Sequence, residues 1–354
     1  MDMWRTIRKH LLLLPLLALL CWSVLAIFYS DLAFRTPLAG AAAITGILSF
    51  FFLSGKKPAL VILLIFGTVL CWWLNLDPSN DRDWQPDVAV LPWAEVRGGI
   101  VLLHNIRSAE YRTRADYTVR HYDAAVSLED LSGVDLFVVY WGTPLIAHTM
   151  LSFRFGEARY ICFSIEARKT RDKQYSAVRS FFRQYELAVV MGDERDLVRL
   201  RTNFRHEEVY LYRLAFNASV ARNVFLEYVH IMNELCRWPQ WYNALFNNCT
   251  TAIRALARPY TRDAALDWRM VVNGKVDELA YERAMLDTRF PFARLKALSR
   301  INDRAWSCPR EDFSRCIRES LPDHDHPAPA GSRPGNSGLT WKCAVSGLSR
   351  EVHG

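Results

Sequence analysis

A single cysteine, Cys249, lies where the sequence predicts the start of a helix. Asn247 and Asn248 before it are favoured N-cap residues, apolar residues then recur at helical spacing, and Pro259 ends the pattern. A thiol in the first turn of a helix is close to the positive end of the macrodipole and to unpaired backbone N–H groups, which favour thiolate and can bind an oxyanion. The pattern predicts a nucleophilic cysteine. The alternative is a small buried apolar residue at a helix start.

A histidine and a carboxylate are brought together by a predicted β-hairpin earlier in the chain. Residues 146–155 alternate between two faces, and residues 159–166 form the returning strand. If residues 156–158 make a three-residue loop, His148 lies across from Glu166 on one face. A two-residue loop would move Glu166 to the opposite face. We predict the three-residue loop; the alternative makes Glu166 a solvated carboxylate at the end of a strand.

Thiol, imidazole and carboxylate are the three parts of a cysteine acyl-transfer site. In this hypothesis His148 takes the proton of Cys249, Glu166 orients His148, and the backbone N–H of Cys249, helped by Asn248, binds the oxyanion. Papain-like enzymes usually carry the cysteine before the histidine. Here the histidine strand precedes the cysteine helix, which is the order of circularly permuted papain-like folds.

Three apolar runs without a charge occupy the N-terminal part of the chain, at residues 11–29, 37–54 and 58–76. Each is close to the roughly 20 residues that a bilayer-spanning helix needs. We therefore predict a three-helix transmembrane anchor over residues 1–76. A signal peptide is the alternative for the first run, but a small-x-small cleavage site is absent there and two further runs follow directly.

The distribution of basic residues predicts the orientation of these helices. Arg5, Arg8 and Lys9 precede the first run, and Lys56 and Lys57 lie between the second and the third. Basic flanks favour the cytoplasmic side of a membrane. With three spans, the rest of the chain is expected outside the cytoplasm.

The net charge and the cysteine positions indicate which class of partner the chain binds and whether it carries a disulfide or a metal site. The formal net charge is +7, yet no zinc-knuckle, RNP-type or helix-turn-helix signature accompanies it, so we predict an anionic lipid surface rather than nucleic acid as partner. Of eight cysteines, Cys308 and Cys316 are a close-spaced candidate disulfide. Their spacing to any histidine is wrong for zinc, and we predict neither a metal nor a cofactor.

The remaining chain is predicted to be an α+β domain with flanking segments. Residues 77–97 are polar and marked by proline, which predicts a linker before a domain over residues 98–300. Residues 301–354 are predicted to be a largely disordered tail, because proline, glycine, serine and histidine dominate from residue 321 on. Within the domain, the patterns predict a buried strand, a helix that runs into a strand, one or two further strands, and an amphipathic helix, at residues 134–140, 174–190, 197–214 and 218–236 respectively.

Several stretches resemble the Lnb N-terminal periplasmic domain family: VDLFVVYWGTPLIAHTMLSFRF, SIEARK, FFRQYEL with VMGDERDLVRLRTNFR and EEVYLYRL, and WYNALFNNCTTAIR. The resemblance covers about residues 98–290. It implies a permuted papain-like, NlpC/P60-related domain with an antiparallel sheet and a catalytic helix, in a membrane-anchored bacterial envelope protein. By motif, the family's cysteine falls on Cys249 and its histidine on His148. In Lnb-type acyltransferases the membrane segments follow the periplasmic domain, whereas here they precede it.

Three functions follow. The first is a thiol acyltransferase, multi-pass in the bacterial inner membrane with its domain in the periplasm, which moves an acyl chain from phospholipid to an amine such as a lipoprotein N-terminus. The second is a hydrolase that cuts cell-wall peptide with the same residues. The third is a non-catalytic envelope protein. An aromatic approach to the site would favour lipid over peptide, and the candidates for it are Trp141, Phe153, Trp241 and Tyr242.

Overall fold

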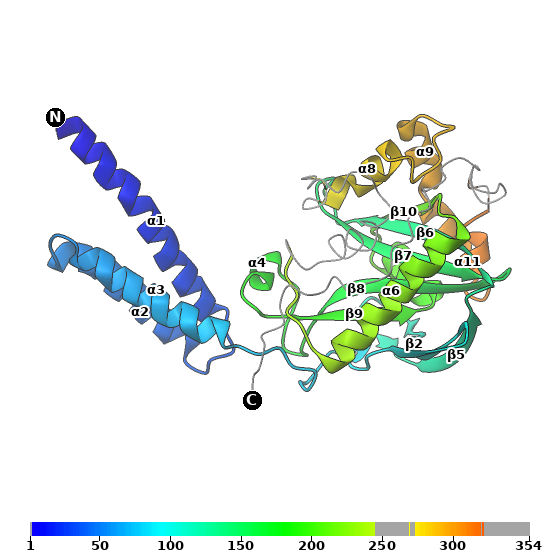
Figure 1. Ribbon diagram of the computed structural model, residues 1–354, viewed down its shortest axis with the longest axis horizontal. Helices are drawn as coiled ribbons and strands as arrows, with labels where there is room; N and C mark the ends of the chain where they lie inside the picture. The colour runs from blue at the N-terminus through cyan, green and yellow to red at the C-terminus, as the bar shows by residue number, and fades with distance from the viewer. Residues whose placement is uncertain (1, 245–268, 270–272, 320, 322–354) are drawn as a thin grey trace.

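The computed structural model describes residues 2–244, 269, 273–319 and 321 of the chain. A group of long helices formed by the N-terminal residues extends from one side of a globular body that contains the sheet (Figure 1). Cys249 and Asn248, and with them the predicted catalytic helix, lie outside the described residues.

The N-terminal group contains α1 (Asp2–Phe28), α2 (Arg35–Phe52) and α3 (Lys57–Leu74). Two of them, α2 and α3, are long and apolar enough to cross a membrane, whereas the apolar part of α1, Leu13–Phe28, is shorter. The prediction of three spans is therefore supported for two, since Leu13–Phe28, the apolar part of α1 that the structure describes, is shorter than a membrane-spanning helix. A Cβ on Gly46 would lie 2.6 Å from Leu20, so glycine allows α1 and α2 to approach closely.

The globular body is a mixed α+β structure around one mostly antiparallel sheet of order β1-β2-β9-β8-β7-β6-β10, with β5 added beside β2. The only parallel pair among its described strands is β2 with β9. The strands of this sheet are β1 (Trp93–Arg97), β2 (Ile100–Arg107), β5 (His121–Ser127), β6 (Leu131–Tyr140), β7 (Ala147–Phe155), β8 (Arg159–Arg168), β9 (Glu186–Gly192) and β10 (Glu208–Arg213). A separate small ribbon joins β3 (Glu110–Tyr111) to β4 (Tyr117–Thr118).

Helices cover both faces of the sheet, which explains why β6 is buried along almost its whole length. On one face, α6 (Ala218–Arg237) packs Phe225 against Phe153 of β7, and α8 (Val276–Glu282) and α9 (Phe292–Ser299) complete that layer. The predicted amphipathic helix over residues 218–236 is confirmed by α6. The other face packs against α5 (Glu194–Arg199), the π-helical turn η2 (Leu200–Phe204), α10 (Asn302–Ser307) and α11 (Phe313–Cys316).

The segment predicted as a linker is instead packed against the body. Trp84 and Val88 are buried, Val88 ends the short 3-10 turn η1 (Pro86–Val88), and β1 pairs with β2 inside the sheet. The guanidinium of Arg168 lies 4.1 Å from the ring centroid of Trp84. A few apolar side chains thus attach a segment whose average composition is polar.

The first part of the segment predicted as a disordered tail is folded. Residues 301–319 carry α10 and α11, with the predicted disulfide Cys308–Cys316 between them, and Phe313 is buried in the core. Residues 322–354 lie outside the described residues.

Two elements predicted from local pattern also differ. The charged residues after β9 begin helix α5, with Asp193 at the N-cap, and the helical turns continue through η2 where a strand was predicted. Over residues 174–190, where a helix running into a strand was predicted, the strand is confirmed by β9, whereas the helix is reduced to α4 (Ala177–Ser180) and a turn. In both places tertiary contacts override a short local signal.

Candidate functional site

The register of the hairpin β7–β8 sets the geometry of the site. Phe155 pairs with Arg159 and Met150 with Ser164, so residues 156–158 form the three-residue loop that the sequence predicted. Gly156 has φ of +60°, a conformation that glycine adopts without strain. Continued to the end of β7, this register places His148 across from Glu166 on the face that packs against α5 and η2.

His148, Ser164 and Glu166 form a hydrogen-bonded chain on this face. The Oγ of Ser164 donates to Oε1 of Glu166 at 2.6 Å, and the Nε2 of His148 lies 2.7 Å from that Oγ and 3.4 Å from Oε1. A serine hydroxyl has one hydrogen, and here the carboxylate receives it, so the Oγ must accept from the imidazole. His148 therefore carries its proton on Nε2, which leaves the lone pair of a neutral ring on Nδ1.

Arg201 completes the surroundings of Glu166. Its Nη2 donates to Oε1 of Glu166 at 2.9 Å, and its Nη1 lies 3.3 Å from Oε2 of Glu207. Burial alone would raise the pKa of Glu166, but the electrostatic attraction of His148 and Arg201, together with the hydrogen bond from Ser164, lowers this pKa to about 2. Glu166 is thus an anion at any physiological pH and a permanent acceptor for Ser164.

Buried ion pairs hold the α5–η2 segment that presents Arg201. Asp196 accepts from Nε and Nη2 of Arg107 at 2.8 and 2.9 Å and from the backbone N–H of Ala109 at 2.8 Å. Two residues before Asp196 in α5, Glu194 accepts a hydrogen bond from Nη1 of Arg318 at 2.7 Å. Both contacts hold α5, which leads directly into the π-helical turn η2, a conformation found frequently at functional sites.

An aromatic side chain stands between His148 and solvent. The ring of Trp141 is stacked on the imidazole, with 5.9 Å between centroids and 10° between planes. His148 is only 4% exposed while Trp141 is 38% exposed. Tyr175 meets Trp141 edge to face at 5.9 Å, and Tyr242 lies 6.4 Å from Tyr175. The approach to His148 from this side is therefore aromatic.

A comparison of the sequence with known protein families gives a match within the globular body. Residues 117–274 match the model of the Lnb N-terminal periplasmic domain. This match covers less than half of the 354 residues, so it is this part of the chain that is similar to the family. No curated protein and no solved structure matches the chain. A periplasmic Lnb domain preceded by two helices that are long and apolar enough to span a membrane indicates a membrane-anchored protein.

The Lnb match contains all four predicted site residues. The structure brings His148 and Glu166 together, whereas Cys249 and Asn248 lie outside the described residues. The chain that leads toward Cys249 is attached at the start of β9, where the N–H of Tyr242 donates to the carbonyl of Tyr185 at 2.9 Å. It therefore leaves the described structure next to Tyr175, beside the aromatic group that covers His148.

Sequence reasoning missed two residues of the candidate site and misplaced one. Ser164 stands in the SIEARK motif two residues before Glu166 and therefore on the same face of β8, a signal that was available. Arg201 was missed because its segment was predicted as a strand. Phe153, proposed for the aromatic approach, lies on the opposite face of β7 against Phe225. Among the described residues, no group of three or more histidine, cysteine, aspartate or glutamate side chains is arranged to hold a metal ion.

The low pKa of Glu166 has a measurable consequence for the Lnb domain. Because the folded-state pKa of about 2 is below the ordinary value of 4.5 for a glutamate, ionised Glu166 stabilises the fold above about pH 4.5 and loses this effect as the pH falls toward 2. The difference in melting temperature between the native protein and Glu166→Gln is expected to be largest at pH 6–7 and to shrink through this window. Exposed Glu129→Gln is the control and should show no such change. A Glu166→Gln difference that stays constant from pH 6 to 3 contradicts the assignment.

Proposed function

We propose that this protein is a membrane-anchored cysteine acyltransferase that moves an acyl chain from a phospholipid to an amine, such as the N-terminus of a lipoprotein. The observation that carries the proposal is the chain Glu166–Ser164–His148, because it gives His148 a fixed tautomer and an ionised partner. A papain-like arrangement, in which Cys249 meets this histidine, is part of the proposal.

In the first half-reaction the thiolate of Cys249 attacks the ester carbonyl of the phospholipid, after His148 has taken the thiol proton. The backbone N–H of Cys249, helped by Asn248, binds the oxyanion of the tetrahedral intermediate. When the intermediate collapses, the ester C–O bond breaks, His148 returns the proton to the leaving alkoxide, and a lysophospholipid departs. The acyl chain is left on Cys249 as a thioester.

In the second half-reaction the acceptor amine attacks the thioester. His148 takes a proton from the attacking nitrogen, the C–S bond breaks, and the thiolate of Cys249 is regenerated as an amide product leaves. Glu166 does not exchange a proton in either step, because its low pKa keeps it ionised; it stabilises the imidazolium that forms twice in each cycle.

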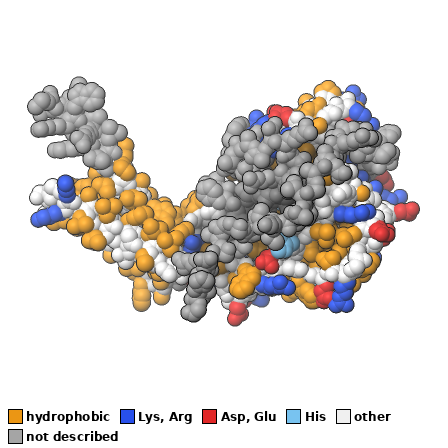
Figure 2. Space-filling view, in the orientation of Figure 1, with side chains coloured by type: hydrophobic (Ala, Val, Ile, Leu, Met, Phe, Trp, Pro, Cys, Tyr) orange, Lys and Arg blue, Asp and Glu red, His pale blue; other side chains and the backbone are white. Residues whose placement is uncertain are grey.

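The proposed location is the bacterial inner membrane, with three spans and the domain in the periplasm. The arrangement of the helices supports it. The N-terminus and the loop between α2 and α3, which hold the basic flanks, both lie at the end of the helical group away from the globular body (Figure 1). Hydrophobic side chains dominate the described surface of these helices, with basic ones at the far end, whereas charged side chains of both signs cover the body (Figure 2). Basic flanks on one side and the domain on the other agree with the positive-inside rule.

The test is intact mass spectrometry of the full-length protein after incubation with phospholipid, beside Cys249→Ala. We expect an acyl adduct that hydroxylamine removes and that only the protein with Cys249 forms. Addition of a lipoprotein-like peptide with a free N-terminal amine should then discharge it as an amide. Discharge to free fatty acid alone would identify a hydrolase, and a Cys249 that forms no adduct and resists alkylation until denatured would identify a non-catalytic protein.

A further inference from the structure

A segment of the globular body packs against the helices of the membrane anchor. The ring of Phe182, just after α4, stacks on Tyr29 with 5.5 Å between centroids and lies 6.4 Å from Trp22 of α1. Phe182 is 5% exposed and shares one apolar cluster with residues from all three helices, namely Ala26, Ile27, Ala39 and Val69. The body thus contacts the anchor through apolar side chains as well as through the connecting chain.

This contact lies alongside the helices rather than beyond their ends. Trp22 precedes the end of α1 at Phe28 by six residues, which corresponds to roughly 9 Å along the helix axis. The headgroup region of a bilayer adds about 5–8 Å to each side of the hydrocarbon core. If α2 and α3 cross a membrane, Phe182 and α4 are therefore at the level of the headgroups. Tyr29 and Trp73 at the helix ends are the aromatic residues typical of that level.

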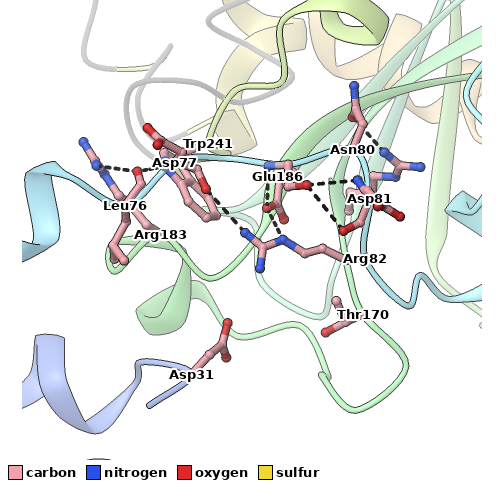
Figure 3. A network of polar contacts seen from close by, with 12 residues as sticks. Asp31, Leu76, Asp77, Asn80, Asp81, Arg82, Thr170, Arg183, Glu186 and Trp241 are labelled. Atoms are coloured by element: carbon pink, nitrogen blue, oxygen red, sulfur yellow. Dashed lines mark hydrogen bonds and ion pairs between the residues drawn. The ribbon is translucent and has the colours of Figure 1, made fainter.

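Polar contacts hold the segment at this depth. The Nη1 of Arg183 donates to the backbone carbonyls of Trp73, Leu74 and Leu76 at 2.7, 3.2 and 3.1 Å and so caps the end of α3. Figure 3 shows this cap beside a second contact, in which Arg82 binds Glu186 of β9 at 2.6 Å.

Further contacts tie the first loop and the body together. The Nζ of Lys173 lies 2.7 Å from Asp31, in the loop between α1 and α2. The guanidinium of Arg179 in α4 faces the ring of Tyr29 at 6.0 Å. Of these two cations, Lys173 is buried against Asp31, whereas Arg179 is partly exposed at the level of the aromatic residues, where anionic lipid headgroups would meet it.

Exposed apolar side chains continue from this level to the candidate site. Val178 of α4 is 46% exposed, and Tyr175, three residues earlier, is 37% exposed and touches Trp141. Leu145 and Ile146, in the same loop as Trp141, are 53% and 47% exposed. The loop ends at β7, whose second residue is His148. We call these five side chains the apolar strip.

We propose that the apolar strip lies against the lipid of the bilayer that holds the anchor and admits an acyl chain from this lipid to His148. The first part needs only the membrane anchor; the second rests on the proposed acyltransferase function. Apolar side chains at headgroup depth are stabilised by burial among acyl chains, and the contacts of Arg183 and Lys173 keep the body from rotating the strip away.

The test is photocrosslinking of the full-length protein in phospholipid nanodiscs. The photoreactive residue p-benzoylphenylalanine replaces Val178 or, in a second variant, Leu145. The matched control carries it in place of Trp306, which is 56% exposed. Trp306 belongs to α10, which packs against η2 and α11, and α11 lies on the side of the body away from the helices (Figure 1). Intact mass spectrometry after irradiation counts phospholipid adducts.

We expect at least tenfold more phospholipid adduct at Val178 and at Leu145 than at Trp306. Equal yields at the three positions, or no lipid adduct at either strip position, would overturn the proposal. The same variants in a Cys249→Ala background test the lipid contact of the apolar strip separately from the proposed reaction. Crosslinks that persist there while the thioester is absent depend on the surface alone, and a failed acyl-transfer assay with intact crosslinks would reject the reaction but not the lipid contact.

Discussion

Replacement of His148 by glutamine is expected to slow acylation of Cys249 by about 10²–10⁴-fold, the usual contribution of a general base. Glutamine approximates the size of the ring and can still donate to Ser164, so the hydrogen-bonded chain to Glu166 is retained. It has no basic nitrogen, however, and cannot take the thiol proton. Because His148 is buried among packed side chains, the melting temperature of the variant must be compared with that of the native protein.

The measurement is the single-turnover rate of thioester formation, followed by intact mass spectrometry after rapid acid quench. The matched control is His104→Gln, since His104 also lies on a strand and also contacts a carboxylate, Asp123 at 2.7 Å. His104 is stacked on Trp93 at the other end of the sheet and has no part in the proposed reaction. A His148→Gln rate within threefold of the native rate would remove His148 from the mechanism.

Ser164→Ala separates orientation of the ring from its basicity. The variant keeps the basic nitrogen of His148 but removes the atom that accepts from Nε2 and links it to Glu166. We expect an intermediate loss of the single-turnover rate, smaller than that of His148→Gln, because the ring then samples both tautomers. A loss as large as that of His148→Gln would indicate that Ser164 itself exchanges a proton.

The parts of the site that could be predicted from the sequence depend on local rules. Alternation with a period of two, together with a glycine turn, determined the β7–β8 register, and this register alone brought His148 to Glu166. Arg201 could not be predicted in this way. Its position depends on buried ion pairs between residues far apart in the chain, such as Arg107 with Asp196, and no local pattern encodes them.

The errors in domain boundaries have a related cause. Composition averages over a segment, whereas packing depends on a few side chains. Trp84 and Val88 attach the polar stretch before β1, and Phe313 attaches the segment after α9. Only the buried positions of such segments contribute much to stability, and these are recognised once the partner surface is known.

Arg318 shows how strongly one distant residue supports the site. This side chain, just after α11, is 5% exposed and donates to Oδ2 of Asp135 on β6 from Nε and Nη2, at 3.0 and 2.8 Å, and to Oε2 of Glu194 on α5 at 2.7 Å. Burial opposes its charge, but Glu194 and Asp135 raise its pKa well above the ordinary value, so Arg318 remains a cation. Arg318 thus connects the segment after α11, the sheet and the α5–η2 segment that presents Arg201.

Arg318→Met is therefore expected to destabilise the protein by about 3–5 kcal/mol, because it leaves buried carboxylates without their shared cation while it preserves most of the side-chain volume. For a domain of this size such a loss corresponds to a decrease in melting temperature of roughly 6–20 °C. The control is Arg315→Met, whose exposed arginine pairs with Asp312 at the surface and should leave the melting temperature nearly unchanged. The measurement is thermal unfolding of both variants in detergent. Equal melting temperatures would mean that Asp135 and Glu194 find other partners when Arg318 is removed. If Arg318→Met also lowers the acylation rate below its melting point, the α5–η2 segment transmits the defect to Arg201 and Glu166, since no atom of Arg318 contacts either residue in the described structure.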